Sequence, residues 1–337
     1  MRVFLTGGGT AGSVTPLLAI AEELPNDEVW FIGTKYGVER ELVGEKLKYK
    51  SVPAGKLRRY FDARNFIDPF IIMWAFLVAV VFLLFKRPAV VVSAGSFVSV
   101  PVVWAAWLLG IKNVVHQQDL QVGLSTKLMK PFASDLTKAF NDIPLQGAVW
   151  TGNPVRDLTT TTDNINIDSE FPTVLVFGGG TGAIAINELV IEQLCDEANV
   201  IHITGEGKSG PSINHVRYHQ YDLLKEEMKE ALYKADVVVS RAGLATISEL
   251  AVLGKPAIII PIPNSHQEIN AEFLKKNNAA KIINQNELTA KIFTKEVMDL
   301  LRNETELNKL QTNIQELAKS DATQQLVKII KQAGNNK

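Results

Sequence analysis

One local pattern occurs twice in this 337-residue chain, once at its start and once near its middle. An apolar run at 2–6 leads into GGGTAG and then into VTPLLAIAEEL, which has helical spacing. A second run at 172–177 leads into GGGTGA and IAINELVIEQL. Strand, glycine turn and helix form the opening unit of a doubly wound α/β domain. We therefore predict an α/β chain of two Rossmann-like domains, each with a parallel sheet.

The domain boundaries follow from a change in composition. Residues 151–170 (TGNPVRDLTTTTDNINIDSE) are polar and rich in Thr and Asn, which is typical of a linker. We predict a first domain at 1–155, a second at 156–320, and a last helix at 321–337 that packs back toward the first domain. Ligands bind beyond the carboxyl ends of parallel strands, so both glycine turns are predicted to face a cleft between the domains.

Charge and cysteine usage exclude several classes of protein. The net charge of −1 gives no basic field for nucleic acid. The single cysteine, Cys195, rules out a disulfide framework and lies in a helical pattern typical of a small core residue. The five histidines show no metal-ligand spacing, so we predict no metal and no cofactor. The N-terminus runs straight into the first strand, and we predict no signal peptide.

The two glycine turns are candidate anion sites. Such turns offer backbone N–H groups at a helix N-terminus. Their dinucleotide-type positions are Gly7, Gly9 and Gly12 in the first turn and Gly178, Gly180 and Ala183 in the second. NAD binding also needs an acidic residue after the second strand, and FIGTKYG has none, so an oxidoreductase is disfavoured. A tight turn without a ligand is the alternative.

A third glycine-containing segment, 207–209 (GKS), matches the end of a P-loop. His202 stands where the leading glycine should be, so we interpret this match as chance.

An apolar stretch in the first half has a different chemistry. Residues 70–85, from Phe70 to Phe85, carry no polar side chain. As a helix they would span about 24 Å, less than the ~30 Å hydrocarbon core. Asp68-Pro69 favours a helix start, and Lys86-Arg87-Pro88 favours its end. The next strand follows at once, so we predict a crossover helix with one face on the sheet. The other face is predicted to dip into an anionic membrane, near the basic residues Lys56, Arg58, Arg59 and Arg64. A wholly buried core helix and a transmembrane span are the alternatives.

Longer motifs extend over nearly the whole chain. They are GGTAGSVTP (8–16), GSFVSVP (95–101), HQQD (116–119), TGNPVR (151–156), GGGTGAIAIN (178–187), SRAGLATISEL (240–250) and HQEINA (266–271). In these the chain resembles the MurG family, the GT-B peptidoglycan N-acetylglucosaminyltransferases of glycosyltransferase family 28. The resemblance implies inverting transfer of N-acetylglucosamine from UDP-GlcNAc to an undecaprenyl-diphosphate-linked muramyl peptide. It also implies a peripheral place on the cytoplasmic side of the cell membrane.

The resemblance further implies a donor site in the second domain. Glu249 would hold the ribose, Gln267 would read sugar hydroxyls, and backbone around Leu224 and Lys225 would grip the uracil. Arg156 would contact the diphosphate, because a planar guanidinium suits it. A first-turn Glu that merely favours the helix dipole and a surface Arg are the alternatives. The implied substrate-contacting set is Thr10, Ala11, Gly12, Asp119, Arg156, Gly180, Lys225, Leu244, Ala245, Thr246, Ile247, Ser248, Glu249, Gln267 and Asn270.

The chain departs from the family at the acceptor face. Ser13 takes the place of a histidine, and Asp119 takes the place of an asparagine. Ser96 also replaces a glycine, and Gly180 replaces a serine. Serine alone cannot act as the base because its pKa is very high, so our hypothesis is that Asp119 takes the proton of the acceptor hydroxyl or orients that hydroxyl. An Asx cap is the alternative for Asp119. His116 is a weaker candidate, and a buried hydrogen-bonded ring is its alternative.

Two other functions remain open at this point. One is a related GT-B glycolipid synthase that glycosylates diacylglycerol. The other is a membrane adaptor that keeps the UDP-sugar site and lacks catalysis, which the changes at Ser13 and Asp119 would allow.

Overall fold

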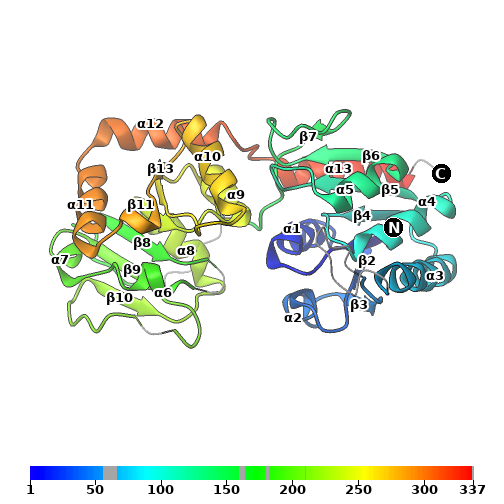
Figure 1. Ribbon diagram of the computed structural model, residues 1–337, viewed down its shortest axis with the longest axis horizontal. Coiled ribbons are helices and arrows are strands. Elements are labelled where there is room, and N and C mark those ends of the chain that lie inside the picture. Colours follow the sequence, from blue (N-terminus) through cyan, green and yellow to red (C-terminus); the bar gives the residue numbers. More distant parts are fainter. Residues whose placement is uncertain (56–66, 159–163, 180–181, 209, 336–337) are drawn as a thin grey trace. The chain divides into compact units, whose positions relative to one another are not determined.

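The computed structural model describes residues 1–55, 67–158, 164–179, 182–208 and 210–335. It divides the chain into two compact units, which we treat separately (Figure 1). Unit 1 comprises Met1–Arg156 together with Lys319–Lys337, and unit 2 comprises Asp157–Ala318. Each unit is a parallel sheet covered by helices, which confirms the predicted fold class.

Unit 1 contains a parallel sheet in the order β3-β2-β1-β4-β5-β6-β7. Its strands are β1 (Arg2–Thr6), β2 (Glu28–Gly33), β3 (Lys48–Ser51), β4 (Val90–Ser93), β5 (Lys112–Gln117), β6 (Asp135–Lys138) and β7 (Val149–Trp150). The chain first builds outward from β1 through β2 and β3, and then returns to add β4 on the other side of β1. The strand order therefore reverses between β1 and β4, which is where such sheets bind ligands.

Helices cover both faces of this sheet (Figure 1). They are the 3₁₀-helix η1 (Ala11–Ser13), α1 (Thr15–Glu22), α2 (Val38–Val43), α3 (Asp68–Lys86), α4 (Ser99–Leu108), α5 (Leu124–Met129), the 3₁₀-helix η3 (Lys130–Phe132) and α13 (Ala322–Asn335). Side chains alternate along β1, because successive residues of a strand point to opposite faces. Val3 and Leu5 pack with α1 and α13, whereas Phe4 packs with α3 and α4.

Helix α3 begins and ends where the sequence predicts. Pro69 lies in its first turn, and Arg87 ends it in the left-handed conformation at φ 46°. A stripe of Ala75, Ala79 and Leu83 is buried, while much of the remaining apolar surface is exposed. The wholly buried alternative is therefore wrong. Among the described residues, α3 is the one helix whose length and composition would allow it to cross a membrane. The basic residues predicted at 56–64 lie outside the described residues.

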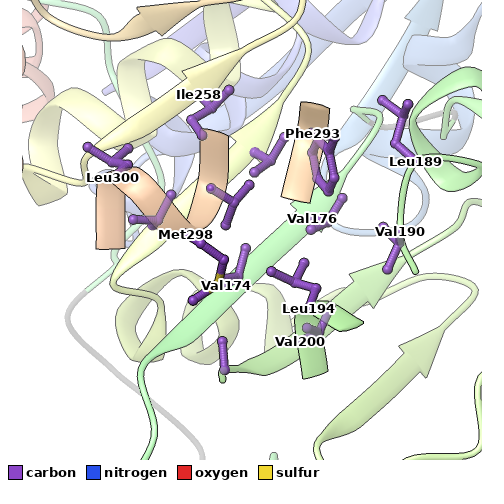
Figure 2. Packing of buried hydrophobic residues seen from close by; sticks show 14 of the residues in the cluster. Val174, Val176, Leu189, Val190, Leu194, Val200, Ile258, Phe293, Met298 and Leu300 are labelled. Atoms are coloured by element: carbon purple, nitrogen blue, oxygen red, sulfur yellow. The ribbon is translucent and has the colours of Figure 1, made fainter. Parts of the chain in front are cut away.

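Unit 2 contains a parallel sheet in the order β10-β9-β8-β11-β12-β13. Its strands are β8 (Thr173–Phe177), β9 (Asn199–Ile203), β10 (Tyr218–Tyr221), β11 (Val237–Ser240), β12 (Ala257–Ile259) and β13 (Lys281–Ile282). Its helices are α6 (Ile184–Asn187), α7 (Glu192–Cys195), α8 (Glu227–Lys234), α9 (Leu244–Leu253), α10 (Gln267–Lys276), the 3₁₀-helix η4 (Gln285–Glu287), α11 (Ala290–Leu301) and α12 (Glu304–Gln315). Figure 2 shows Val174 and Val176 of β8 in one core with Leu194 and Phe293.

The helix predicted over IAINELVIEQL is broken. It forms α6 and α7, and Ile191 between them is extended at φ −128° and ψ 158°. Asn187 is the last residue of α6, and its side chain ties this end to β9 and the residue after it: Nδ2 donates to Thr204 O at 3.1 Å and Oδ1 pairs with His202 Nε2 at 3.2 Å. Cys195 is fully buried, and burial raises the pKa of its thiol to about 11, which confirms it as a core residue.

Candidate functional site

The carboxyl ends of the central strands meet at one edge in each unit. In unit 1, Thr6 of β1 pairs with Ser93 of β4, so the first glycine turn and the loop after β4 leave side by side. In unit 2, Val176 of β8 pairs with Val239 of β11, so the second glycine turn lies beside the loop into α9. Both turns therefore lie at the switch points where ligands of this fold bind.

The amides of the first turn are largely occupied by the protein itself. Gly8 N donates to Ser13 Oγ at 3.2 Å, and Gly9 N donates to Glu39 Oε2 at 3.0 Å. The Ser13 hydroxyl also lies 2.9 Å from Gly8 O and 3.1 Å from Thr10 O, so it braces the turn. The prediction that this turn offers open amides to a phosphate is wrong at Gly8 and Gly9. Thr10 and Ala11 are exposed and Gly12 is half-buried, so all three remain accessible.

The structure supports the structural alternative for His116. The ring is 1% exposed, Nδ1 lies 2.9 Å from Thr137 Oγ1, and Nε2 lies 3.3 Å from Asn153 Oδ1. Burial lowers its pKa to about 4, so the ring is neutral. With both nitrogens paired inside unit 1, His116 ties β5 to β6 and to the segment after β7.

Asp119 lies exposed, two residues beyond the end of β5. The amide of Gln117 fixes this loop by donating to Asp119 O at 2.6 Å and to Gln121 O at 3.1 Å. Gln118 donates to Ala94 O at 2.9 Å and so ties the loop to the end of β4. The carboxylate of Asp119 is thus carried on a braced loop at the ligand-binding edge of the sheet.

Helix α9 presents its first turn to solvent. Gly243 is the N-cap, no side chain caps the helix, and the first turn holds no acidic residue. Leu244, Ala245 and Thr246 are half-exposed, and Glu249 is half-exposed further along the helix. Backbone N–H groups at such an end favour an anion.

Two predicted residues of α9 face inward. Ile247 is fully buried and its amide donates to Gly243 O at 2.9 Å, which removes it from the substrate-contacting set. Ser248 is also buried, and its hydroxyl donates to Leu244 O at 2.8 Å. The side chain of Ser248 therefore bonds within the helix, because a serine hydroxyl readily bonds the carbonyl four residues earlier.

The loop before α9 is held from two sides. Asn270, which is buried, donates from Nδ2 to Ala242 O at 2.9 Å, so this predicted contact residue supports the loop. Arg241, which the sequence analysis did not single out, is buried and donates to Ile260 O, Pro261 O and Gln285 Oε1 at 3.1, 3.3 and 2.7 Å. Gln267 is half-buried, and its Oε1 accepts from Ile262 N at 3.2 Å.

A hollow of about 540 Å³ opens beside β10 and α8. Its lining is Glu206, Tyr221, Asp222, Leu223, Lys225, Glu226 and Glu227. The family resemblance predicts uracil binding around Leu224 and Lys225, and Lys225 is part of this lining. The lining combines Tyr221 and Leu223 with Lys225 and four carboxylates.

Lys208 lies against the second glycine turn. Its Nζ donates to Gly182 O at 2.8 Å. Gly182 has φ 68°, and a Cβ there would lie 2.2 Å from Thr204 O, so only glycine fits. The GKS segment is no P-loop, but its lysine does reach a glycine turn, which sequence reasoning missed. Gly180 lies outside the described residues.

Arg156 is the remaining predicted contact residue that the structure describes. Arg156, half-buried, is the last residue of the N-terminal part of unit 1. Within the described ranges, no group of three or more His, Cys, Asp or Glu could hold a metal ion.

Two parallel-sheet units, each with a glycine turn at its switch point, define the chain as a member of the GT-B class of folds. The crystal structure of MurG from Acinetobacter baumannii matches with a TM-score of 0.76 and 25% identity, covering 98% of this chain and 99% of that one. A UDP-GlcNAc 2-epimerase from Neisseria meningitidis matches with a TM-score of 0.68 at 12% identity, covering 98% of this chain and 100% of the epimerase; at that identity the likeness concerns the fold alone.

The family is given by sequence. The glycosyltransferase family 28 N-terminal domain matches residues 3–137, and the family 28 C-terminal domain matches residues 173–326. The chain belongs to glycosyltransferase family 28 and is a glycosyltransferase. It is 34% identical to UDP-N-acetylglucosamine–N-acetylmuramyl-(pentapeptide) pyrophosphoryl-undecaprenol N-acetylglucosamine transferase of Clostridium kluyveri, over 98% of each chain. The enzyme of the same name from Lachnoclostridium phytofermentans is 38% identical, over 86% of this chain and 87% of that one.

Proposed function

We propose that this enzyme transfers N-acetylglucosamine from UDP-GlcNAc to an undecaprenyl-diphosphate-linked N-acetylmuramyl peptide in peptidoglycan synthesis. The observation that carries the proposal is the similarity, over nearly the full length of both chains, to relatives whose names state this reaction.

The donor would bind to unit 2. The uracil would occupy the hollow that Lys225 lines. The diphosphate would bind at the first turn of α9, Leu244–Thr246. The backbone N–H groups at this helix N-terminus lie at the positive end of the helix dipole, which attracts an anion. Glu249 would accept hydrogen bonds from the ribose, and Gln267 would bond the sugar hydroxyls. Arg156 would add positive charge to the leaving diphosphate.

The acceptor would meet unit 1 at Thr10, Ala11 and Gly12. In the transfer, the acceptor oxygen bonds the anomeric carbon as the bond from that carbon to the diphosphate breaks, with inversion. UDP leaves as an anion, and the acceptor proton passes to a base. Asp119 is our candidate for the base, because its carboxylate is exposed on a braced loop while Ser13 bonds within its own turn.

We also propose that α3 binds the cytoplasmic face of the membrane peripherally. Its side chains Phe70, Trp74 and Phe85 are 76, 60 and 81% exposed. Ammonium groups lie close by, since Lys50 and Lys86 stand over the rings of Phe82 and Trp30 at 5.4 and 4.7 Å. An apolar helix face with neighbouring cations suits an anionic membrane surface.

Radiolabel transfer from UDP-GlcNAc to the lipid-linked muramyl peptide tests the reaction. The expected product is the lipid-linked disaccharide. Transfer to diacylglycerol instead would identify a glycolipid synthase. UDP-GlcNAc binding without transfer to either acceptor would identify an adaptor, and either result would reject the proposal.

Asp119→Asn tests the base, with Asp135→Asn as a matched control. Asp135 is exposed at the start of β6. It therefore lies at the amino ends of the strands, whereas Asp119 lies beyond their carboxyl ends. We expect Asp119→Asn to lower kcat by about 100-fold or more, with UDP-GlcNAc affinity unchanged by titration calorimetry. Undiminished kcat would leave Asp119 as a structural cap.

Vesicle sedimentation tests the membrane contact. The double variant Phe70→Ser and Phe85→Ser should bind phosphatidylglycerol vesicles about 100-fold more weakly, from ~1.5 kcal/mol for each of the two phenylalanines. Val216→Ser, at an 84% exposed valine of unit 2, is the control. Equal binding by both variants would exclude α3 as the contact.

A further inference from the structure

The carboxylate of Glu39 is buried beneath the first glycine turn and has no role in the reaction described so far. Glu39 belongs to α2 and has no exposed surface. Its oxygens accept hydrogen bonds from Gly9 N at 3.0 Å, Thr34 N at 2.8 Å and Thr34 Oγ1 at 2.5 Å. Two backbone amides and a hydroxyl around one carboxylate form the kind of cradle that proteins build for a bound anion.

Three glycines from separate segments make room for this carboxylate. A Cβ at Gly8 would lie 2.5 Å from Glu39 Oε1, and one at Gly37 would lie 2.2 Å from Oε2. A Cβ at Gly33, the last residue of β2, would lie 2.7 Å from Glu39 Cγ. Any other residue at these positions would displace the side chain.

This cradle ties the first glycine turn to the loop after β2. We propose that Glu39 is a built-in anion in unit 1, which holds the turn in the shape that presents Thr10, Ala11 and Gly12 to the acceptor. Glu39 is thus a positioning residue, and this role rests on the proposed function.

The charge state of Glu39 fits this role. Burial raises the pKa of the carboxyl, but the hydrogen bonds from Thr34 and Gly9 outweigh burial, and its pKa lies below the ordinary value. The side chain is therefore an anion at neutral pH. A neutral carboxyl would carry a proton toward donors that already point at it.

The first test compares Glu39→Gln with Glu41→Gln, an exposed glutamate two residues along the same helix. The amide of Glu39→Gln keeps the volume but directs an NH₂ group at an N–H donor. We expect kcat/KM for the lipid acceptor to fall about 100-fold, as for a misplacement of ~1 Å, with the Kd for UDP-GlcNAc unchanged. Acceptor kinetics equal to those of Glu41→Gln would overturn the proposal.

The second test is rescue by a small carboxylate and needs no enzymatic activity. Glu39→Ala leaves a carboxylate-sized space, so formate should raise the thermal midpoint of unit 1 in this variant and not in the wild-type chain. Formamide is the neutral control. The proposal is overturned if formate has no effect on the folded variant, or acts equally on the wild-type chain. If wild-type transfer fails but formate still binds the variant, the proposed function is wrong while the built-in anion stands. Restored acceptor turnover in formate supports both.

Discussion

The buried ring of His116 should make the stability of unit 1 depend on pH. Burial lowers the pKa of this ring from 6.5 to about 4. The unfolded chain therefore takes up the proton first, and stability is lost as the pH falls from 6.5 toward 4. A pKa difference of that size corresponds to about 3 kcal/mol over the whole window, with a slope of at most about 1.4 kcal/mol per pH unit.

Tryptophan fluorescence isolates this effect in unit 1. All five tryptophans, at 30, 74, 104, 107 and 150, lie in unit 1, and unit 2 has none. Urea denaturation followed by tryptophan emission at several pH values between ~6.5 and ~4.5 therefore reports the free energy of unfolding of unit 1. His116→Gln keeps polar atoms near Thr137 and Asn153 but cannot titrate.

The expected result is a shallower slope in His116→Gln, lower by about 1 kcal/mol per pH unit than in the wild-type chain. Protonation of buried carboxylates such as Glu39 also lowers the free energy of unfolding of unit 1 in acid. These carboxylates are present in both chains, so their effect cancels in the comparison. His202→Gln is the control: His202 is equally buried, with its pKa also lowered to about 4, but it lies in unit 2. Equal slopes in His116→Gln and wild type would refute the reasoning.

Three further predictions concern backbone strain and charge. Ser96 has φ 81°, so Ser96→Gly should stabilise unit 1 by about 1 kcal/mol in the same urea assay. Gly182→Ala should destabilise unit 2 by more than ~2 kcal/mol, followed by circular dichroism, since its Cβ would meet backbone. Gly179→Ala, with positive φ but open space, should cost only about 1 kcal/mol. Lys208→Gln should weaken UDP binding several-fold in calorimetry, with Lys309→Gln on α12 as control; unchanged affinity would leave Lys208 a structural residue.

Local rules account for the parts of the fold that the sequence predicts well. The first strand was expected at 2–6, which is where β1 lies, because a short apolar run followed by three glycines favours a strand and a turn. Helix α3 starts beside Pro69 and stops before Pro88, since proline is tolerated only at the first turn of a helix. The break after Asn187 could not be predicted this way. At this point the side chain of Asn187 bonds Thr204 and His202, which are distant in the sequence.

The candidate site also has parts that the local sequence predicts and parts that depend on distant residues. The SRAGLATISEL motif predicts a helix near Ala245, and α9 begins at Leu244. The segment VERELV, by contrast, looks like an ordinary surface helix with charged side chains. Nothing local distinguishes Glu39 from Glu41, and the difference arises only when the first turn and the end of β2 bring their amides to one of them.

The two glycine turns show why their shared pattern cannot assign a ligand. Both follow a buried strand and both lie at a switch point, so the backbone geometry alone predicts an anion site in each. The side chains that reach them have opposite charge: the carboxylate of Glu39 bonds the first turn, and the ammonium of Lys208 bonds the second. The two turns therefore differ in the charge bonded to them, although their sequences share one pattern. That difference comes from residues that do not belong to the glycine pattern itself.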